Sequence, residues 1–275
     1  TAKSIVIYSN VGLGKSSLFR NAPNACYLNL ENRLGQVDGT FSEERVISLD
    51  DFEKFVSDVE QEKAVIERIK VLISEGNKKG LETAKSKLKD QYDDYYNVAT
   101  GKIPYLRLLV IDAMDDLYSM VVKEKCTELG IKDLSELDRN QGYGITRTRF
   151  LDLVRRTMNL NIPIIMLCGI TKAKEAWNTE GKDIPFLGSG SSYKVLSRKV
   201  TGVFAIDEKS DGKRYLYTNP KNANFFIKNG FDDFFNNKKL PNEIPLDFEE
   251  LNKWTNLYSK EELDAWKKQH NLKKL

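Results

Sequence analysis

A short loop at residues 9–16 constrains the fold more than any other feature of the chain. It reads Ser9-Asn-Val-Gly-Leu-Gly-Lys-Ser16 and follows an apolar, β-branched run at residues 4–8 of the kind that forms a buried parallel strand. The loop matches the phosphate-binding pattern G-x-x-x-x-G-K-[ST] at its last three positions, while Ser9 stands where the first glycine is usual. With a helix expected to begin at Lys15, the order strand, loop, helix predicts an α/β fold that holds a phosphate group.

The residue types in this loop have separate chemical roles. Gly12 and Gly14 allow backbone N–H groups to approach phosphate oxygens closely, and Lys15 would reach the β- and γ-phosphates. The Ser16 hydroxyl would complete the shell of a bound Mg²⁺. The alternative is a glycine-rich turn that merely precedes a helix. We expect ATP to contact these loop residues: Asn10, Val11, Gly12, Leu13, Gly14, Lys15, Ser16 and Ser17.

Carboxylates at the ends of two predicted strands would complete the site. Asp112 follows the apolar run at residues 106–111, where it would hold Mg²⁺ together with Ser16; a cap on the next helix is the alternative. Glu31 ends the strand predicted after the loop. If that strand neighbours the first one, Glu31 would face the γ-phosphate and polarise an attacking water; a surface position is its alternative. Asp115 and Asp116 are interpreted as charges at a helix start.

Composition argues against several classes of site. The chain has one histidine, His270, which stands among lysines near the C-terminus; this argues against a His-dependent triad and a His-rich zinc site. Three widely separated cysteines, Cys26, Cys126 and Cys168, indicate a reduced compartment rather than a disulfide framework. The 43 basic and 40 acidic residues give a net charge of +3, too little to predict a polyanionic partner from charge alone. No apolar run approaches the ~20 residues of a membrane span, so no membrane partner is expected.

Alternating strands and helices predict a mostly parallel sheet. Further strands are expected at residues 25–30, 45–49, 106–111, 162–168, 200–207 and 214–218, and helices at residues 115–128 and 145–159. Residues 51–100 hold 11 acidic and 9 basic residues with apolar residues at helical spacing, which predicts an inserted helical hairpin. We divide the chain into a core at residues 1–240, which contains this insertion, and an extension at residues 241–275. The extension holds a short helix at residues 260–269, begun by a capping box of Ser259 and Glu262.

Together, these residues resemble the RecA/RadA core of P-loop ATPases. The chain is more closely similar to small RecA-like ATPases of bacteriophages, AAA-domain proteins linked to single-strand annealing and recombination. The resemblance is carried by APNACYLNLE at 22–31, LLVIDAMDDL at 108–117, Tyr143-Gly144 before a helix, IPIIMLCGITKAKE at 162–175, VTGVFAIDEKSDGKRYLYTNP at 200–220 and LPNEIPLDFEEL at 240–251. It spans most of the chain except residues 51–100. It implies a RecA-like P-loop NTPase core, a mostly parallel sheet flanked by helices, in which Glu31 and Lys15 are catalytic.

The resemblance also implies further contacts to ATP, with ATP and Mg²⁺ as cofactors. The family usually carries a polar γ-phosphate sensor, often His or Gln, after the strand at residues 162–168; here Thr171 or Lys172 would have to serve. A Lys-x-Arg near the end of the family's core reaches the neighbouring subunit's nucleotide. This sequence has Lys228 there without the arginine, and Arg214 is the alternative.

The loop at residues 171–199 is the candidate nucleic-acid surface. It interleaves basic residues with Trp177, Phe186 and Tyr193, a pattern that suits single strands, because phosphate attraction and base stacking need no sequence readout. Its basic residues include Lys172, Lys174, Lys182, Lys194, Arg198 and Lys199. In RecA-like cores this loop contacts DNA. The alternative is a solvated basic face with its aromatic rings packed inward.

These features predict an ATP-binding and ATP-hydrolysing protein that acts on single-stranded DNA in phage recombination or replication. Hydrolysis would be slow and stimulated by DNA or by oligomerisation. The resemblance implies a homo-oligomer, a single-strand-binding protein as a partner, and the cytoplasm of a bacterial host. Two alternatives stay open: a nucleotide-dependent assembly protein with little hydrolysis, and a small nucleotide kinase. The acidic helix after Asp112 and the lack of an Arg-rich lid argue against the kinase.

Overall fold

The computed structural model describes residues 2–31, 37–137, 141–172, 181–187, 192–231 and 239–275. Within them, a nine-stranded sheet has the order β11-β9-β8-β1-β5-β4-β2-β3, with β10 paired to β8. Its strands are β1 (Ser4–Tyr8), β2 (Ala25–Asn29), β3 (Ser42–Arg45), β4 (Leu108–Asp112), β5 (Ile164–Cys168), β8 (Gly202–Glu208), β9 (Arg214–Tyr217), β10 (Lys228–Asn229) and β11 (Glu243–Pro245). Pairings from β8 to β3 are parallel, and those that involve β9, β10 or β11 are antiparallel. The predicted α/β fold with a mostly parallel sheet is confirmed.

The register aligns the ends of the central strands. Tyr8 of β1 lies beside Cys168 of β5. Asp112 of β4 lies between Leu167 of β5 and Asn29 of β2. Because these strands are parallel, the residues that follow them emerge at one carboxyl edge of the sheet. The loop at residues 9–16 therefore leaves the sheet at the same edge as the ends of β2 and β4.

Burial explains why short apolar runs form these strands. All five residues of β1, β2, β4 and β5 are buried, as near-continuous apolar strands require when both faces of a sheet are covered. The flanking helices include α4 (Met114–Leu129), α5 (Gln141–Met158) and α6 (Ser192–Lys199), and a separate small sheet pairs β6 (Ile170–Lys172) with β7 (Asp183–Pro185). Among the described residues, no helix is long and apolar enough to cross a lipid bilayer.

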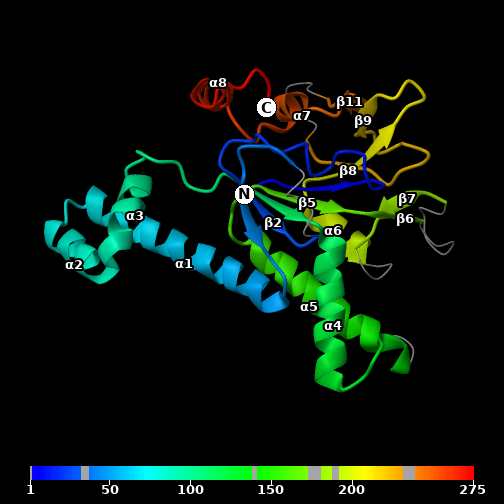
Figure 1. Ribbon diagram of the computed structural model, residues 1–275, viewed down its shortest axis with the longest axis horizontal. Coiled ribbons are helices and arrows are strands. Elements are labelled where there is room, and N and C mark those ends of the chain that lie inside the picture. Colours follow the sequence, from blue (N-terminus) through cyan, green and yellow to red (C-terminus); the bar gives the residue numbers. More distant parts are fainter. Residues whose placement is uncertain (1, 32–36, 138–140, 173–180, 188–191, 232–238) are drawn as a thin grey trace.

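A long helix, α1 (Leu49–Ser74), leaves the core and carries two more helices at its far end (Figure 1). Its first half belongs to the main core, because Phe52, Val56 and Val59 are buried in the main apolar cluster. An ion pair of 2.9 Å between Arg149 of α5 and Glu53 fixes the same half. The start of the helical segment expected at residues 51–100 therefore packs in the main core.

The far half of α1 builds a second, smaller core with α2 (Lys78–Leu88) and α3 (Tyr92–Ala99). Its buried side chains, Ile66, Ile69, Leu72 and Tyr92, lie outside the main apolar cluster. The chain returns to the sheet beside α1, where the Tyr105 hydroxyl donates to Glu62 Oε2 at 3.1 Å. We call residues 63–103 the distal helical unit.

The segment after residue 239 completes one edge of the sheet and part of its core. β11 pairs with β9, and Phe248, the first residue of α7 (Phe248–Thr255), packs edge-on against Phe19 with ring centres 5.7 Å apart. The Tyr258 hydroxyl donates to the Pro23 carbonyl at 2.8 Å. α8 (Lys260–Gln269) begins at the predicted capping box of Ser259. This segment therefore supports the chain just after the loop at residues 9–16.

Two predicted elements differ from the structure. Residues 15–22 form turns rather than the expected helix, with short-range hydrogen bonds such as Leu18 N to Lys15 O at 3.2 Å. Two serines and the proline at position 23 leave this run too short and too poor in helix formers to propagate a helix. The strand expected at residues 45–49 lies instead at residues 42–45, because Ser48 and Asp51 form the capping box that starts α1.

Candidate nucleotide-binding and hydrolysis site

The loop at residues 9–16 has a backbone that glycine adopts most easily at two positions. Gly12 and Gly14 have φ angles of +85° and +91°, in the left-handed region that other residues disfavour. A Cβ at Gly14 would lie 3.4 Å from Leu246 Cδ2 and 3.5 Å from a guanidinium nitrogen of Arg214. A side-chain carbon at position 14 would thus make ordinary contacts, and it is the positive φ angles that favour glycine at both positions.

Ser9, in the place of the usual first glycine, holds the lysine of the loop. Lys15 Nζ donates to the carbonyl and the hydroxyl oxygens of Ser9, each at 3.1 Å, and to the Asn10 carbonyl at 3.3 Å. Ser9 is fully buried, and its N–H donates to the Cys168 carbonyl at 3.3 Å. The serine thus adds an oxygen that glycine lacks. Sequence reasoning treats position 9 only as a tight turn and misses this contact.

Ser16 and Asp112, the two residues predicted to hold a metal ion, lie in contact. The Ser16 hydroxyl donates to the Asp112 carboxylate. Asp112 ends β4 and is only 3% exposed. Its carbonyl accepts from the N–H groups of Leu30, at 2.7 Å, and Glu31, at 3.3 Å. These bonds join the end of β2 to the end of β4 and hold Glu31 at the edge of the sheet.

Burial raises the pKa of Asp112 to about 6. The hydrogen bond from Ser16 and the charge of Lys15 lower this pKa, whereas the carboxylates of Glu31 and Asp115 raise it. Desolvation is the largest of these effects, because a buried carboxylate loses the water that stabilises its charge. A cation beside Asp112 would lower the pKa again.

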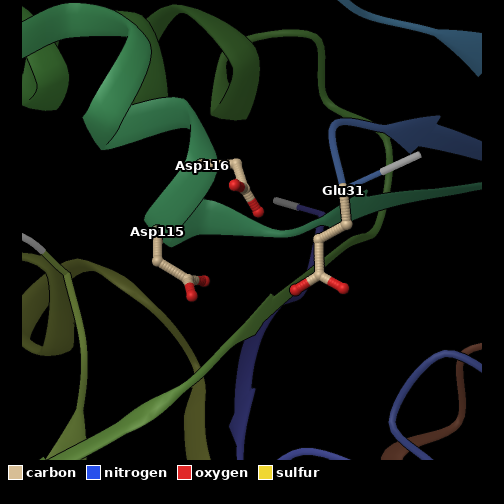
Figure 2. A group of neighbouring side chains, drawn as sticks. All are labelled: Glu31, Asp115 and Asp116. Atoms are coloured by element: carbon tan, nitrogen blue, oxygen red, sulfur yellow. The ribbon is translucent and has the colours of Figure 1, made fainter. Parts of the chain in front are cut away.

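Glu31, Asp115 and Asp116 bring three more carboxylates together. One oxygen of each lies within 4.8 Å of one oxygen of the other two. Figure 2 shows Glu31, after the end of β2, opposite the two aspartates in the first turn of α4. The interpretation of Asp115 and Asp116 as helix-start charges is confirmed. Their closeness to Glu31 depends on the order of the strands, which no local pattern in the sequence reveals.

Glu31 reaches this edge although its strand is not beside β1. β5 and β4 lie between β1 and β2, so the premise that the two strands are neighbours is wrong. The parallel strands nevertheless end at one level, and Glu31 lies close enough to Asp112 for its charge to raise the Asp112 pKa. The structure therefore brings Glu31 to the edge where Lys15 and Ser16 lie.

The oxygen donors at this edge fit a magnesium ion. Mg²⁺ binds carboxylate, hydroxyl and water oxygens, and Ser16 and Asp112 supply a hydroxyl and a carboxylate in contact. Asp115 Oδ1 is buried and has no hydrogen-bond partner within the described part of the chain. An oxygen of this kind is an available ligand for an ion or its water. Ser16 and Asp112 would hold the ion, and the neighbouring carboxylates would strengthen its attraction.

A cleft of about 850 Å³ opens beside the loop, on the side of β9. Gly14, Ser17 and Leu18 line it from the loop, and Arg214 and Leu246 line it from the opposite side. This volume lies in the range of small-molecule sites. The cleft continues directly from the phosphate-binding loop, and Arg214 lies beside the loop of its own chain.

The residues predicted to sense the γ-phosphate lie in β6, off the main sheet. Thr171 pairs with Ile184 of β7. Lys172 forms an ion pair of 2.5 Å with Asp183. β6 follows Gly169 at the end of β5, where an added Cβ would lie 3.3 Å from Asp115 Oδ2. The backbone at position 169 therefore lies beside Asp115 of the acidic cluster.

Lys228 has structural contacts in its own chain. Its Nζ donates to the Ser197 carbonyl at 2.7 Å and to the Val200 carbonyl. Both carbonyls lie at the end of α6, where a cation is favoured by the helix dipole. Burial lowers the Lys228 pKa. We therefore leave Lys228 out of the candidate site.

The candidate nucleic-acid loop at residues 171–199 is described in part. Lys174 and Trp177 lie outside the described residues. Tyr193 is 1% exposed and packs edge-on against Phe226 with ring centres 5.1 Å apart. The prediction of an open stacking ring is therefore wrong for Tyr193, because α6 turns this ring into the core. Phe186 is exposed.

An α/β sheet with this loop and these carboxylates at its carboxyl edge defines the class of P-loop nucleotide-binding proteins. An AAA-domain family model matches residues 1–229, and the chain belongs to that family. Among solved structures, the chain is similar to the KaiC-like protein PH0186 from Pyrococcus horikoshii OT3, with 11% identity over 78% of this chain and 77% of that chain, at a TM-score of 0.37. It is also similar to the RadB recombinase, with 13% identity over 78% of this chain and 79% of that chain, at a TM-score of 0.34. Similarities of this size carry no conclusion about activity or partners. No curated protein matches the chain significantly.

Proposed function

We propose that the protein binds ATP with Mg²⁺ and hydrolyses it. This proposal rests on one observation: four residues lie together at one edge of the sheet, namely Lys15, Ser16, Asp112 and Glu31. Each of the other three shifts the pKa of Asp112. The loop offers N–H groups and an ammonium to phosphates, and the strand ends offer carboxylates to a cation and a water. Membership of an AAA-domain family supports nucleotide binding.

Each of these residues has a part in the proposed reaction. Lys15 would exchange the oxygens of Ser9 and Asn10 for those of the β- and γ-phosphates. Ser16 and Asp112 would hold Mg²⁺, which neutralises charge on the phosphate oxygens when bound. Glu31 would take a proton from the water that attacks the γ-phosphorus. As the water oxygen bonds to phosphorus, the bond to the ADP oxygen breaks, so the products are ADP and phosphate.

The cleft beside the loop would hold the nucleoside part of ATP. Leu18 and Leu246 give it apolar walls, and Arg214 brings a positive charge to the side that Gly14 leaves open. Arg214 Nε donates to Glu208 Oε2 at 3.0 Å, which orients the guanidinium from β8. We propose that Arg214 contacts the nucleotide of its own chain rather than that of a neighbouring subunit.

We also propose single-stranded DNA as the substrate on which the ATPase acts, within a homo-oligomer. Support comes from residues 194–239, which hold ten basic and five acidic residues, and from the exposed side chains of Phe186, Arg198 and Lys199. Positive charge with an open ring suits a single strand. A role in phage recombination or replication, with a single-strand-binding protein in a bacterial cytoplasm, rests on the resemblance of the sequence alone.

Measurement of ATP turnover with and without single-stranded DNA tests the proposal. The wild type should hydrolyse ATP, and DNA should raise the rate. Lys15→Ala should lose ATP binding or turnover, whereas Lys260→Ala, at an exposed lysine of α8, should match the wild type. ATP binding without turnover under both conditions would favour the assembly protein. Equal ATP affinity and turnover in folded Lys15→Ala and wild type would refute the loop's proposed role.

A further inference from the structure

Asn29, the last residue of β2, lies next to Asp112 in the sheet. Its residue is 2% exposed. Its backbone pairs with Asp112 of β4 on one side and with Arg45 of β3 on the other, and neighbouring strands lie about 4.8 Å apart. A buried amide therefore stands beside the carboxylate that is proposed to hold the metal ion.

Asn29 and Asp112 point to the same face of the sheet, the face that carries the phosphate-binding loop. Alternate residues of a strand share a face. The Tyr27 hydroxyl, two residues before Asn29, donates to the Ser16 carbonyl at 2.7 Å, and the Asp112 carboxylate accepts from the Ser16 hydroxyl. The Asn29 side chain thus lies on the side of the sheet where Ser16 and Asp112 meet.

Glu43 holds the Asn29 amide in one orientation. Asn29 Nδ2 donates to Glu43 Oε1 at 2.5 Å, and Glu43 lies in β3, beside Tyr27. An ionised carboxylate only accepts hydrogen bonds, so the NH₂ group must face Glu43. The amide oxygen is therefore turned away from β3, towards the side on which Asp112 lies.

The Asn29 oxygen is a buried acceptor to which the described residues offer no donor. Oδ1 is buried and has no hydrogen-bond partner among them. An unpaired buried polar atom is costly, and such atoms nearly always have a partner in folded proteins. The ionised carboxylate of Asp112 cannot supply a donor, because it is itself an acceptor. Two neighbouring oxygens of this kind fit a water molecule or a cation beside them.

We propose that Asn29 is a positioning residue of the ATP site. Its Oδ1 accepts a hydrogen bond from a water in the shell of the Mg²⁺ that Ser16 and Asp112 would hold. Mg²⁺ keeps several of its waters in proteins, and residues that bind a metal's ligands orient them. Glu43 acts one step further out, because it fixes the Asn29 amide. This inference rests on the proposed function, and it adds a residue that no sequence motif singles out.

The test measures metal binding without hydrolysis. Mn²⁺ prefers the same oxygen ligands as Mg²⁺, and its affinity for the protein saturated with ADP is titrated through the electron paramagnetic resonance signal of the free ion. Asn29→Leu removes the oxygen at similar side-chain size. Glu43→Gln removes the carboxylate that fixes the amide. Its matched control is Glu44→Gln, at an exposed glutamate on the opposite face of β3.

In Asn29→Leu, the Mn²⁺ affinity should fall by about 10- to 100-fold, as for other residues that act on a metal through one of its ligands. The affinity for ADP without metal should stay at the wild-type value. Glu43→Gln should weaken Mn²⁺ binding less, because a glutamine can donate or accept and no longer fixes the amide. Glu44→Gln should match the wild type.

A double variant tests rescue. Asn29→Asp combined with Glu43→Gln exchanges the amide and the carboxylate, so that the glutamine can donate and one oxygen again faces the ion's shell. This variant should recover at least the wild-type Mn²⁺ affinity. Denaturant unfolding without ligands and circular dichroism check that each variant is folded.

Failure of this inference and failure of the proposed function give different results. Wild-type Mn²⁺ affinity in folded Asn29→Leu, with or without a loss of stability, would show that Asn29 only supports the fold, and the proposed ATPase would stand. Equal weakening in Glu43→Gln and Glu44→Gln would assign the effect to net charge and overturn the role of Glu43. No Mn²⁺ binding by the wild type with ADP would overturn the proposed metal site itself, and the role of Asn29 with it.

Discussion

Replacement of Asp112 by asparagine should stabilise the protein while it removes the proposed metal site. The carboxylate is 3% exposed, and burial raises its pKa to about 6, against about 3.9 for an unperturbed aspartate. A difference of about two pKa units corresponds to about 3 kcal/mol. The asparagine side chain would keep an oxygen for the Ser16 hydroxyl but would carry no charge. We therefore expect Asp112→Asn to raise the free energy of unfolding by up to about 3 kcal/mol at pH 8.

The gain in the free energy of unfolding of Asp112→Asn should grow as the pH rises. Between about pH 4 and pH 6 the folded protein holds the Asp112 proton more tightly than the unfolded chain does. A rise in pH through this window therefore lowers the stability of the wild type relative to the variant, and the full difference is reached above the folded pKa. Below about pH 4 both states hold the proton, and the difference should disappear.

Denaturant unfolding of both proteins without nucleotide or metal, at pH 4 and at pH 8, measures this difference directly. The wild-type and variant curves are compared at each pH, so that titration of other groups cancels. ATP turnover with Mg²⁺ is measured in parallel and should be lost in Asp112→Asn. An equal free-energy difference at the two pH values, or a variant less stable than the wild type at pH 8, would refute the burial argument.

Three more perturbations have outcomes set by the structure. Glu31→Gln keeps the shape of the side chain but removes the base, so ATP should still bind while turnover falls by roughly 10²-fold or more. Turnover equal to that of the wild type would show that Glu31 is a surface residue without a catalytic role. Gly14→Ala, at φ +91°, should lower the free energy of unfolding by about 1–2 kcal/mol in denaturant and weaken ATP binding, whereas Gly144→Ala, in open space on α5, should not. Replacement of the distal helical unit, residues 63–103, by a short Gly-Ser linker should leave ATP binding intact in a binding assay, because this unit buries its own small core; loss of folding would show that it belongs to the main core.

The central sheet could be predicted from sequence because its strands are buried on both faces. Runs such as residues 4–8 and 106–111 are apolar at nearly every position, and this signal is local. The phosphate-binding loop could also be predicted, because the approach of backbone N–H groups to a phosphate requires glycines and a lysine at a fixed spacing. The prediction of a helix after the loop is wrong. This run is short, holds two serines and precedes Pro23, so its conformation depends on tertiary contacts that a local sequence pattern does not describe.

The rest of the candidate site depends on contacts between distant segments. Asp115 and Asp116 lie close to Glu31 because the sheet places β4 beside β2. The order of the strands cannot be predicted from local residue spacing. Tyr193 is indistinguishable in sequence from an open stacking ring, yet one helical turn directs it into the core. The placement of Arg214 beside Gly14 likewise requires the antiparallel pairing of β8 and β9.

One consequence follows from the continuity of α1. This helix has 26 residues, and at 1.5 Å per residue it is about 39 Å long. Its first half packs in the core beside α5, and α2 and α3 pack at its far end. A tilt of the whole unbroken helix by about 10° about its first residue would move the far end by about 7 Å. A small rotation of α1 beside the sheet would thus displace its far end, with α2 and α3, by more than the rise of one helical turn.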